Sequence, residues 1–141
     1  MIKQLDQTQS QDLLRRERMG RLGCIADHDP YVVPVNYVFD GECAYSHSLP
    51  GQKIDAMRSH PRVCLQVDKI QDEWNWKSVL AFGSYEEITN RQERSDALNR
   101  LLSRFSRLTP VESFIAEDAG APAPIVFRIR VDKLTGISEG D

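Results

Sequence analysis

The sequence lacks any apolar run close to the ~20 residues that a membrane-spanning helix requires. Its first residues, Met1-Ile2-Lys3-Gln4-Leu5-Asp6, also lack the apolar centre of a secretory signal peptide. No GxGxxG motif is present, so the sequence offers no Rossmann-type site for a stably bound nicotinamide. We therefore expect a protein of the cytoplasm that does not enter a membrane.

Cysteine is also scarce. The chain has three cysteines, Cys24, Cys43 and Cys64, an odd number with no CxxC pair among them. These facts argue against a disulfide framework and against a zinc site built on CxxC motifs. All three lie in strand-like stretches, where a cysteine usually serves as a small buried hydrophobe. The cysteines therefore indicate a reduced, cytoplasmic protein.

An excess of positive charge is absent as well. Lysine and arginine number 18 against 21 acidic residues, a net charge of −3, so no global basic field would attract nucleic acid. The apolar fraction of 40% and the charged fraction of 28% are those of an ordinary globular protein. A length of 141 residues is suitable for one domain, which we place at residues 1–141.

Three helical segments are predicted. Thr8 and Gln11 resemble a capping box at the start of the first, and Gly20 can end it in a left-handed conformation. The second runs from about residue 51 to residue 59, just before a proline that restricts the chain. The third, between residues 91 and 105, has apolar residues at helical spacing.

Six strands are predicted from alternating or β-branched stretches. Asp40-Gly41 is a hairpin signal, Pro34 indicates an edge strand or a bulge, and Gly83 indicates a bulge or a close approach. Residues 117–124, rich in alanine, proline and glycine, are predicted to form a loop. The strands span residues 21–26, 31–38, 42–48, 62–68, 77–88 and 124–131.

The order of these elements favours a mainly β protein with peripheral helices. Hairpin-type connections dominate, so the sheet should be mainly antiparallel. Six such strands with short helices between them most economically form a small barrel with its helices outside.

One short stretch of this pattern carries chemistry. Ser48 ends a strand, Gly51 follows a proline, and Lys53 stands at the mouth of the second helix beside Gln52. The first turn of a helix has backbone N–H groups without intrahelical partners, and its dipole favours a negative charge. The stretch therefore predicts a phosphate site with Lys53 as its one formal cation. The alternative from these residues alone is a serine-capped helix with a solvated lysine.

The wider sequence resembles a known family. The stretches GRLGCIAD, YVVPVNYVFDGECAYSHS, GQKIDAMRSHPRVCLQVD and WKSVLAFGSYEEI are similar to those of the pyridoxamine 5′-phosphate oxidase-like, FMN-binding split-barrel family. They are most similar to its nitroimidazole-resistance branch, and the resemblance covers about residues 8 to 105. It implies a homodimer of six-stranded antiparallel split barrels, with one FMN in each of two clefts at the interface.

The resemblance also assigns residues to the flavin site. One strand would run along the isoalloxazine ring and meet its polar edge with backbone groups, and the next strand would follow. The phosphate would be held at the helix start, and the fifth predicted strand would approach the ring or the ribityl chain. In that order the residues are Val33, Pro34, Val35 and Asn36; Tyr45, Ser46 and His47; Ser48, Gln52 and Lys53; and Trp76 and Ser78.

Two departures from the family pattern are visible. Members often carry a basic pair at the phosphate position, whereas this chain has Gln52 before Lys53. The oxidase proper has an arginine-rich segment for its substrate near the C-terminus, whereas this chain ends in an acidic stretch, residues 136–141. The second departure argues against pyridoxamine phosphate as the substrate.

The histidines and tryptophans each have two interpretations. His47 would lie beside the flavin and could donate a proton to a substrate, or it could pack at the dimer interface. His28 falls in a turn and His60 at a helix end, and no pair of histidines has metal-ligand spacing, so no metal site is expected. Trp74 and Trp76 could line the flavin cleft or fill the interface.

The function predicted from the sequence is that of an FMN-binding oxidoreductase. Reduced flavin would pass electrons to a small acceptor such as a nitro compound or a quinone. The alternative is a flavin- or haem-binding module without turnover of its own, because a fold does not fix an activity.

Overall fold

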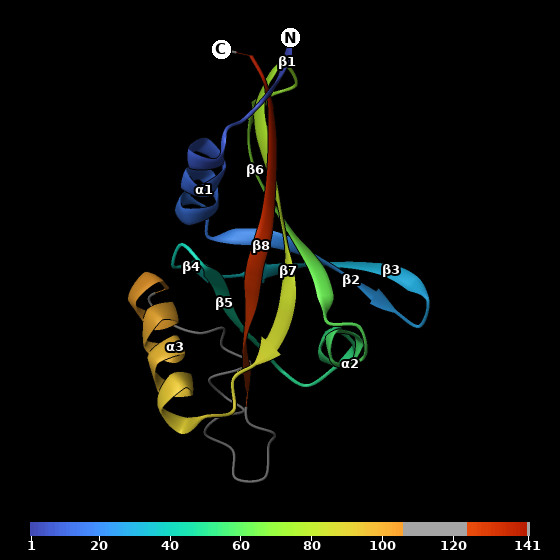
Figure 1. The fold of residues 1–141 in the computed structure, drawn as a ribbon, viewed down its shortest axis with the longest axis vertical. Coiled ribbons are helices and arrows are strands. Elements are labelled where there is room, and N and C mark those ends of the chain that lie inside the picture. The colour runs from blue at the N-terminus through green and yellow to red at the C-terminus, as the bar shows by residue number, and fades with distance from the viewer. Residues whose placement is uncertain (106–123, 141) are drawn as a thin grey trace.

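The computed structural model describes residues 1–105 and 124–140, and in this part of the chain eight antiparallel strands form one sheet (Figure 1). The strand order is β3-β2-β6-β7-β8-β5-β4, with β1 paired to β8. Three helices lie against this sheet. The elements are β1 (Ile2–Gln4), α1 (Gln7–Arg16), β2 (Met19–Ala26), β3 (Asp29–Asn36), β4 (Val38–Phe39), β5 (Cys43–Ser48), α2 (Gln52–Ser59), β6 (Arg62–Asp72), β7 (Asn75–Glu87), α3 (Arg91–Arg104) and β8 (Ile125–Glu139).

All six predicted strands are present, but the predicted number was too low. The strand expected over residues 31–38 is divided into β3 and β4 at Tyr37. Tyr37 is buried, its backbone N–H donates to the carbonyl of Arg18 (3.0 Å), and its hydroxyl donates to the carbonyl of Leu14 (2.6 Å). The chain is therefore fixed at this point to the end of α1 instead of continuing along one strand.

The other differences are strand ends without a clear apolar pattern. The largest is at β8, which was expected to end at residue 131 but continues to Glu139, paired with β7. β1 was missed because its three residues are all exposed and do not alternate. Residues 69–72 were expected to be a loop, but β6 extends to Asp72, whose carboxylate accepts from Trp74 N–H (2.8 Å). Such a side-chain turn supports a tight hairpin made of polar residues. The predicted loop at residues 117–124 lies outside the described residues apart from Pro124.

The first helix differs from the prediction at both ends. Its N-cap is Asp6, which accepts from Gln9 N–H (2.7 Å), and not Thr8. Gly20 does not end the helix. It lies buried in β2, where an added Cβ would come within 2.8 Å of a Leu65 methyl group. Glycine is needed here because β2 and β6 are closely packed.

The barrel core lies between the sheet and two of the helices. Leu14 of α1 and Met57 of α2 are fully buried in it. Gly83 lies at the predicted irregularity, since the β7–β8 register shifts between Phe82 and Gly83. A Cβ at Gly83 would overlap the backbone of Arg130. Glycine thus lets two strands bend and approach as the barrel curves.

The third helix covers a different part of the barrel. Ala97 of α3 packs with Ile88 and Val126 in a second, smaller cluster, with Tyr45 of β5 against it. Figure 1 shows α1 and α3 on one side of the long β7–β8 pair and α2 on the other. No helix in the described residues is long and apolar enough to span a bilayer.

Candidate functional site

Strand β3, with the residues predicted to face a flavin ring, lies at one end of the sheet. It pairs with β2 and with no other strand among the described residues, which confirms the edge position indicated by Pro34. Val35 is buried in the core and Val33 packs against it, whereas the Pro34 side chain is exposed on the other face. One backbone edge of β3 therefore has no strand beside it and is available to a ligand.

The end of β3 is attached to β5 by one side chain. Ser46 is buried, and its hydroxyl donates to the carbonyl of Asn36 (2.6 Å). The Ser48 hydroxyl is also buried and donates to the carbonyl of Leu49 (2.9 Å), so in this structure it does not cap α2. Because side chains alternate along a strand, Ser46 and Ser48 share one face of β5 while Tyr45 and His47 share the other.

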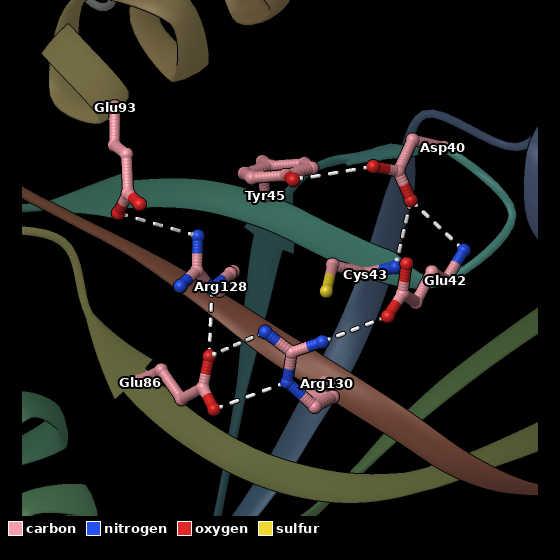
Figure 2. A network of polar contacts seen from close by, with 8 residues as sticks. All are labelled: Asp40, Glu42, Cys43, Tyr45, Glu86, Glu93, Arg128 and Arg130. Carbon is pink, nitrogen blue, oxygen red and sulfur yellow. Dashed lines mark hydrogen bonds and ion pairs between the residues drawn. The ribbon is translucent and has the colours of Figure 1, made fainter.

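The side chain of Tyr45 packs against the small cluster that contains Ala97 of α3, and Figure 2 shows its contact with Asp40. Its hydroxyl donates to the Asp40 carboxylate (3.1 Å), and the Arg100 guanidinium lies 5.3 Å from the ring centroid. Burial and then the neighbouring Asp40 charge raise the pKa of Tyr45, which keeps the hydroxyl protonated. The alternation along β5 places His47 on this same face, in register with Val126.

The start of α2 differs from the other two helix starts. Asp6 and Asn90 cap α1 and α3 with side-chain hydrogen bonds, whereas the N-cap of α2 is Gly51, with no side-chain cap. A helix start without a side-chain cap is one of the arrangements in proteins that suit an anion. Burial raises the pKa of the Cys24 thiol on β2, and the positive charge of Lys53 acts against that shift.

The two predicted residues of β7 lie on the outer face of the sheet within a polar row. Ser78 Oγ accepts from Gln66 Nε2 (3.1 Å), and Gln66 Nε2 also donates to Asp68 (3.0 Å). Arg21 of β2 forms an ion pair with Asp68 at 3.2 Å. Trp76 donates through its indole nitrogen to a Glu139 carboxylate oxygen, 3.1 Å away.

The sequence analysis missed Arg21, Gln66 and Asp68, which connect the predicted groups. Only the strand register could have indicated these residues, because Arg21 of β2 lies opposite Pro34 of β3 on one side and Gln66 of β6 on the other. Three strand spacings of about 4.8 Å separate β3 from β7, and Ser78 lies two residues along β7 from Leu80, the position in line with Pro34. Ser78 therefore lies roughly 16 Å from Pro34 on one continuous face. Within a single chain the predicted residues therefore form two groups, one on β3, β5 and the start of α2, and the other on β7.

The remaining histidines lie away from both groups. His28 is exposed in the β2–β3 turn, and His60 is the C-cap of α2, as the sequence indicated. Within residues 1–105 and 124–140, no three histidine, cysteine or acidic side chains gather closely enough to hold a metal ion.

An ionic network connects two arginines of β8 to acidic residues of the neighbouring elements (Figure 2). Glu86 of β7 accepts from Arg128 Nε (2.7 Å) and from Arg130 Nε (3.1 Å). Arg130 also binds Glu42 at 2.8 Å, and Arg128 lies 3.7 Å from Glu93 of α3. The network therefore connects β7, β8, α3 and Glu42 beside the start of β5.

We expect this network to make stability depend on pH. The hydrogen bonds from Arg130 and Arg128 lower the pKa of Glu86 in the folded protein. The ionised carboxylate therefore contributes in full to the free energy of unfolding above its unfolded pKa of about 4.3. This contribution is lost as the pH falls through the lower folded pKa. Glu86→Gln should reduce the free energy of unfolding by about 1 kcal/mol at pH 7, because the carboxylate is partly exposed. Urea unfolding at about pH 7 and at about pH 2.5, on either side of the unfolded value, checks this. An equal deficit at both values would show that the charge of Glu86 is not its cause.

These features together define a class of protein. In the described residues an antiparallel barrel has an edge strand, β3, and a helix, α2, whose start has no side-chain cap. Residues 6–138 match the pyridoxamine 5′-phosphate oxidase family. The chain belongs to this family, and its fold is the split barrel of that family.

Two similar proteins support this assignment over nearly the whole chain. The protein RA0666 of Rhizobium meliloti is 34% identical over 141 residues, which cover 96% of this chain and 93% of that protein. An FAD-binding protein of Mesorhizobium loti has a crystal structure that is 31% identical, with a TM-score of 0.82 and 99% of both chains covered.

The resemblance to the nitroimidazole-resistance branch is distant in structure. A protein of Bacteroides thetaiotaomicron described as a 5-nitroimidazole antibiotic resistance protein is 21% identical. Its crystal structure has a TM-score of 0.74 and covers 98% of this chain and 89% of its own. That similarity supports a shared fold and leaves the branch unassigned.

Proposed function

We propose that this protein binds a flavin through its FMN portion and transfers electrons from the reduced flavin to a small acceptor such as a nitro compound or a quinone. The observation that carries the proposal is the α2 start. Its N-cap is Gly51 without a side-chain cap, and Lys53 follows two residues later. An anion is the natural ligand of such a helix start.

The described residues fit the group that the family implies. Lys53 and the first N–H groups of α2 would hold the phosphate, with Gln52 and Ser48 beside it. The unpaired backbone edge of β3 would meet the polar edge of the ring, and Pro34 would lie along its face. The bound flavin would supply the redox chemistry, and the protein would supply position and access.

A second copy of the chain would complete the site. The outer face of the sheet carries exposed apolar side chains on β2, β3, β6 and β8, and the helices pack elsewhere. Exposed apolar patches of this kind typically mark interaction surfaces. A twofold axis on this face would bring the Trp76 and Ser78 of one copy towards the β3 edge of the other, joining the two groups. The exposed residues are Met19, Ile25, Val32, Ile70 and Ile137.

The alternative function is a flavin- or haem-binding module without turnover. Anaerobic reduction of the flavin-loaded protein, followed by mixing with a quinone or a nitroarene, separates the two. The proposed function predicts that the flavin absorbance returns while each reduced flavin delivers two electrons to the acceptor. A flavin that stays reduced with a panel of such acceptors would favour the binding module.

The phosphate role of Lys53 has a quantitative consequence. Lys53→Met should weaken FMN binding about 10- to 100-fold, since a charge-assisted hydrogen bond is worth about 1.5–3 kcal/mol. Riboflavin lacks the phosphate, so its affinity should barely respond. Gln52→Arg should strengthen FMN binding and again leave riboflavin unchanged. Fluorescence titration of the apoprotein with both ligands measures this, and equal losses for both in Lys53→Met would place the lysine away from the phosphate.

A further inference from the structure

Three lysines form a row across one end of the sheet. Lys3 of β1 lies opposite Ser138 of β8, and Ser138 lies opposite Lys77 of β7. Lys77 in turn lies opposite Lys69 of β6. Residues directly opposite on antiparallel strands point to the same face of a sheet, and three spacings of about 4.8 Å make this lysine row roughly 14 Å long. The chain has five lysines in all, and three of them lie here.

The lysine row lies beyond the barrel core, on the face that the core occupies further along the same strands. Val67 of β6 and Val79 of β7, each two residues from a lysine of the row, are fully buried, whereas Lys69 and Lys77 are exposed. Figure 1 shows the end of the sheet at β1 extending past α1, the helix that packs on this face lower down. The three ammonium groups are therefore presented to solvent.

The lysine row does not stabilise the fold. Like charges directly opposite on neighbouring strands destabilise a sheet, and Lys69 and Lys77 are such a pair. Within residues 1–105 and 124–140, none of the three ammonium groups forms an ion pair or a hydrogen bond. Lysines on edge strands can keep sheets from joining, but Lys77 lies in a strand that is paired on both sides. The row is therefore better explained by binding than by folding.

A hollow of about 220 Å³ opens beside two lysines of the row. The amides of Gln71 and Asn75 add hydrogen-bond donors to it, and the carboxylate of Glu139 already accepts from an indole nitrogen. Small-molecule pockets typically measure about 300–1,000 Å³, so this hollow is too small for a nucleotide and suits a single carboxylate side chain. It is lined by Lys69, Gln71, Asn75, Trp76, Lys77 and Glu139.

The chemistry of the row favours an acidic protein surface as its partner. Lysine is a compact point charge, whereas arginine is the usual residue for the bidentate recognition of phosphate in nucleic acids. The chain is rich in arginine, yet the row contains none. A net charge of −3 also provides no wider basic field for a long polyanion. Complementary charge of this kind steers encounters between proteins, and those between redox proteins have small interfaces.

The position of the row connects it with the proposed flavin site, and this step rests on the proposed function. Lys77 lies between Trp76 and Ser78, and successive side chains of a strand point to opposite faces. The row is therefore on the back of the strand proposed to cover the flavin of the second copy. Reduced flavin requires a source of electrons, and the chain has no Rossmann-type motif for a bound nicotinamide. A carrier docked on the row would be separated from the flavin by one layer of sheet.

We propose that the lysine row is the docking surface for an acidic electron-carrier protein that reduces the bound flavin. Two reduced one-electron carriers would each transfer one electron to one flavin, whose protons come from solvent, and both carriers would leave oxidised. A carboxylate of the carrier would enter the hollow between Lys69 and Lys77, and further carboxylates would lie along the row towards Lys3.

Anaerobic reduction of the flavin-loaded protein by a reduced plant-type ferredoxin, a small acidic carrier, tests this by stopped flow. The wild-type rate should fall as salt is added, because salt screens the steering charges. Lys77→Glu should lower the rate at low salt at least about 10-fold, since steering raises association rates by about 10–10³-fold. Reduction by dithionite, a small reductant, should change little. The melting temperature should not fall, because the new carboxylate lies opposite Lys69.

Arg91→Glu is the matched control, because it changes the net charge by the same amount at an exposed position. Arg91 is the first residue of α3, at the opposite end of the molecule from the row (Figure 1). An acidic residue suits the first turn of a helix, so the fold should be retained. The rate with ferredoxin should stay within about 3-fold of the wild-type rate, since salt screens a charge so far from the row.

Each outcome decides a different claim. Equal rates with ferredoxin for the wild type and Lys77→Glu, or an equal loss in Arg91→Glu, would overturn the docking assignment. Reduction of the wild type by dithionite alone would also overturn it, while leaving the flavin site in place. A protein that binds no flavin would overturn the proposed function and this inference together. Binding of single-stranded DNA that is lost in Lys77→Glu, without reduction by ferredoxin, would assign the row to nucleic acid instead.

Discussion

Ile70→Asp is expected to convert the proposed dimer to a monomer at micromolar concentration and to release the proposed flavin. Ile70 is 67% exposed in a single chain, so an aspartate there should leave the fold intact. It lines a hollow together with Trp76 and Ser78, the residues proposed to cover the ring bound to the second copy. A twofold axis introduces the charge twice, and burying an unpaired charge costs several kcal/mol. A loss of about 1,000-fold in dimer affinity corresponds to ~4 kcal/mol.

Leu102→Asp provides the matched control for this substitution. Leu102 is 46% exposed on α3, away from the outer face of the sheet, so a charge there should affect neither assembly nor flavin content. Light scattering and the flavin-to-protein absorbance ratio can be measured on the same preparations. A wild-type monomer that retains flavin, or an Ile70→Asp dimer with full flavin content, would contradict the proposed role of this face.

His47→Asn is expected to leave flavin content nearly unchanged and to lower turnover by ~10²–10⁴-fold if the imidazole donates a proton to the acceptor. The structure also supports a second possible role for His47, in packing. His47 shares one face of β5 with Tyr45, whose side chain packs towards α3. A role in packing would instead lower the melting temperature or the dimer affinity and leave the rate per bound flavin unchanged.

The pH dependence of the rate separates these two roles further. General acid catalysis predicts a rate that falls towards alkaline pH, and His47→Asn should remove that fall. His28→Asn is a suitable control when FMN is the bound flavin, because asparagine tolerates the left-handed conformation of this turn. Unchanged rate, melting temperature and assembly in His47→Asn would dismiss His47 from both roles.

The sequence predicted the order of strands well where apolar alternation was present. Val63, Leu65 and Val67 alternate with more polar neighbours, and β6 indeed buries all three. The pattern failed where strands are polar on both faces, as at residues 69–72 of β6. There the pairing with β7 and the Asp72 turn hold the strand, and neither is visible in local periodicity.

The candidate site could be predicted only as far as it is local. Gly51 to Lys53 form one helix start, so their grouping follows directly from the sequence. Arg21, Gln66 and Asp68 come from two strands and meet through strand register, which depends on the whole sheet. Gly20 shows the same limit, because its requirement for glycine comes from β6 packed across it and not from the end of a helix.

The measurement that tests the central claim most directly is the absorption spectrum of the purified protein, incubated with FMN or FAD and then freed of unbound ligand. The account predicts the two flavin bands, in the near-ultraviolet and in the blue, with one flavin for each chain. It also predicts that Lys53→Met loses most of that signal for FMN under the same conditions. A Soret band, or a colourless protein after incubation with either flavin, would contradict the account.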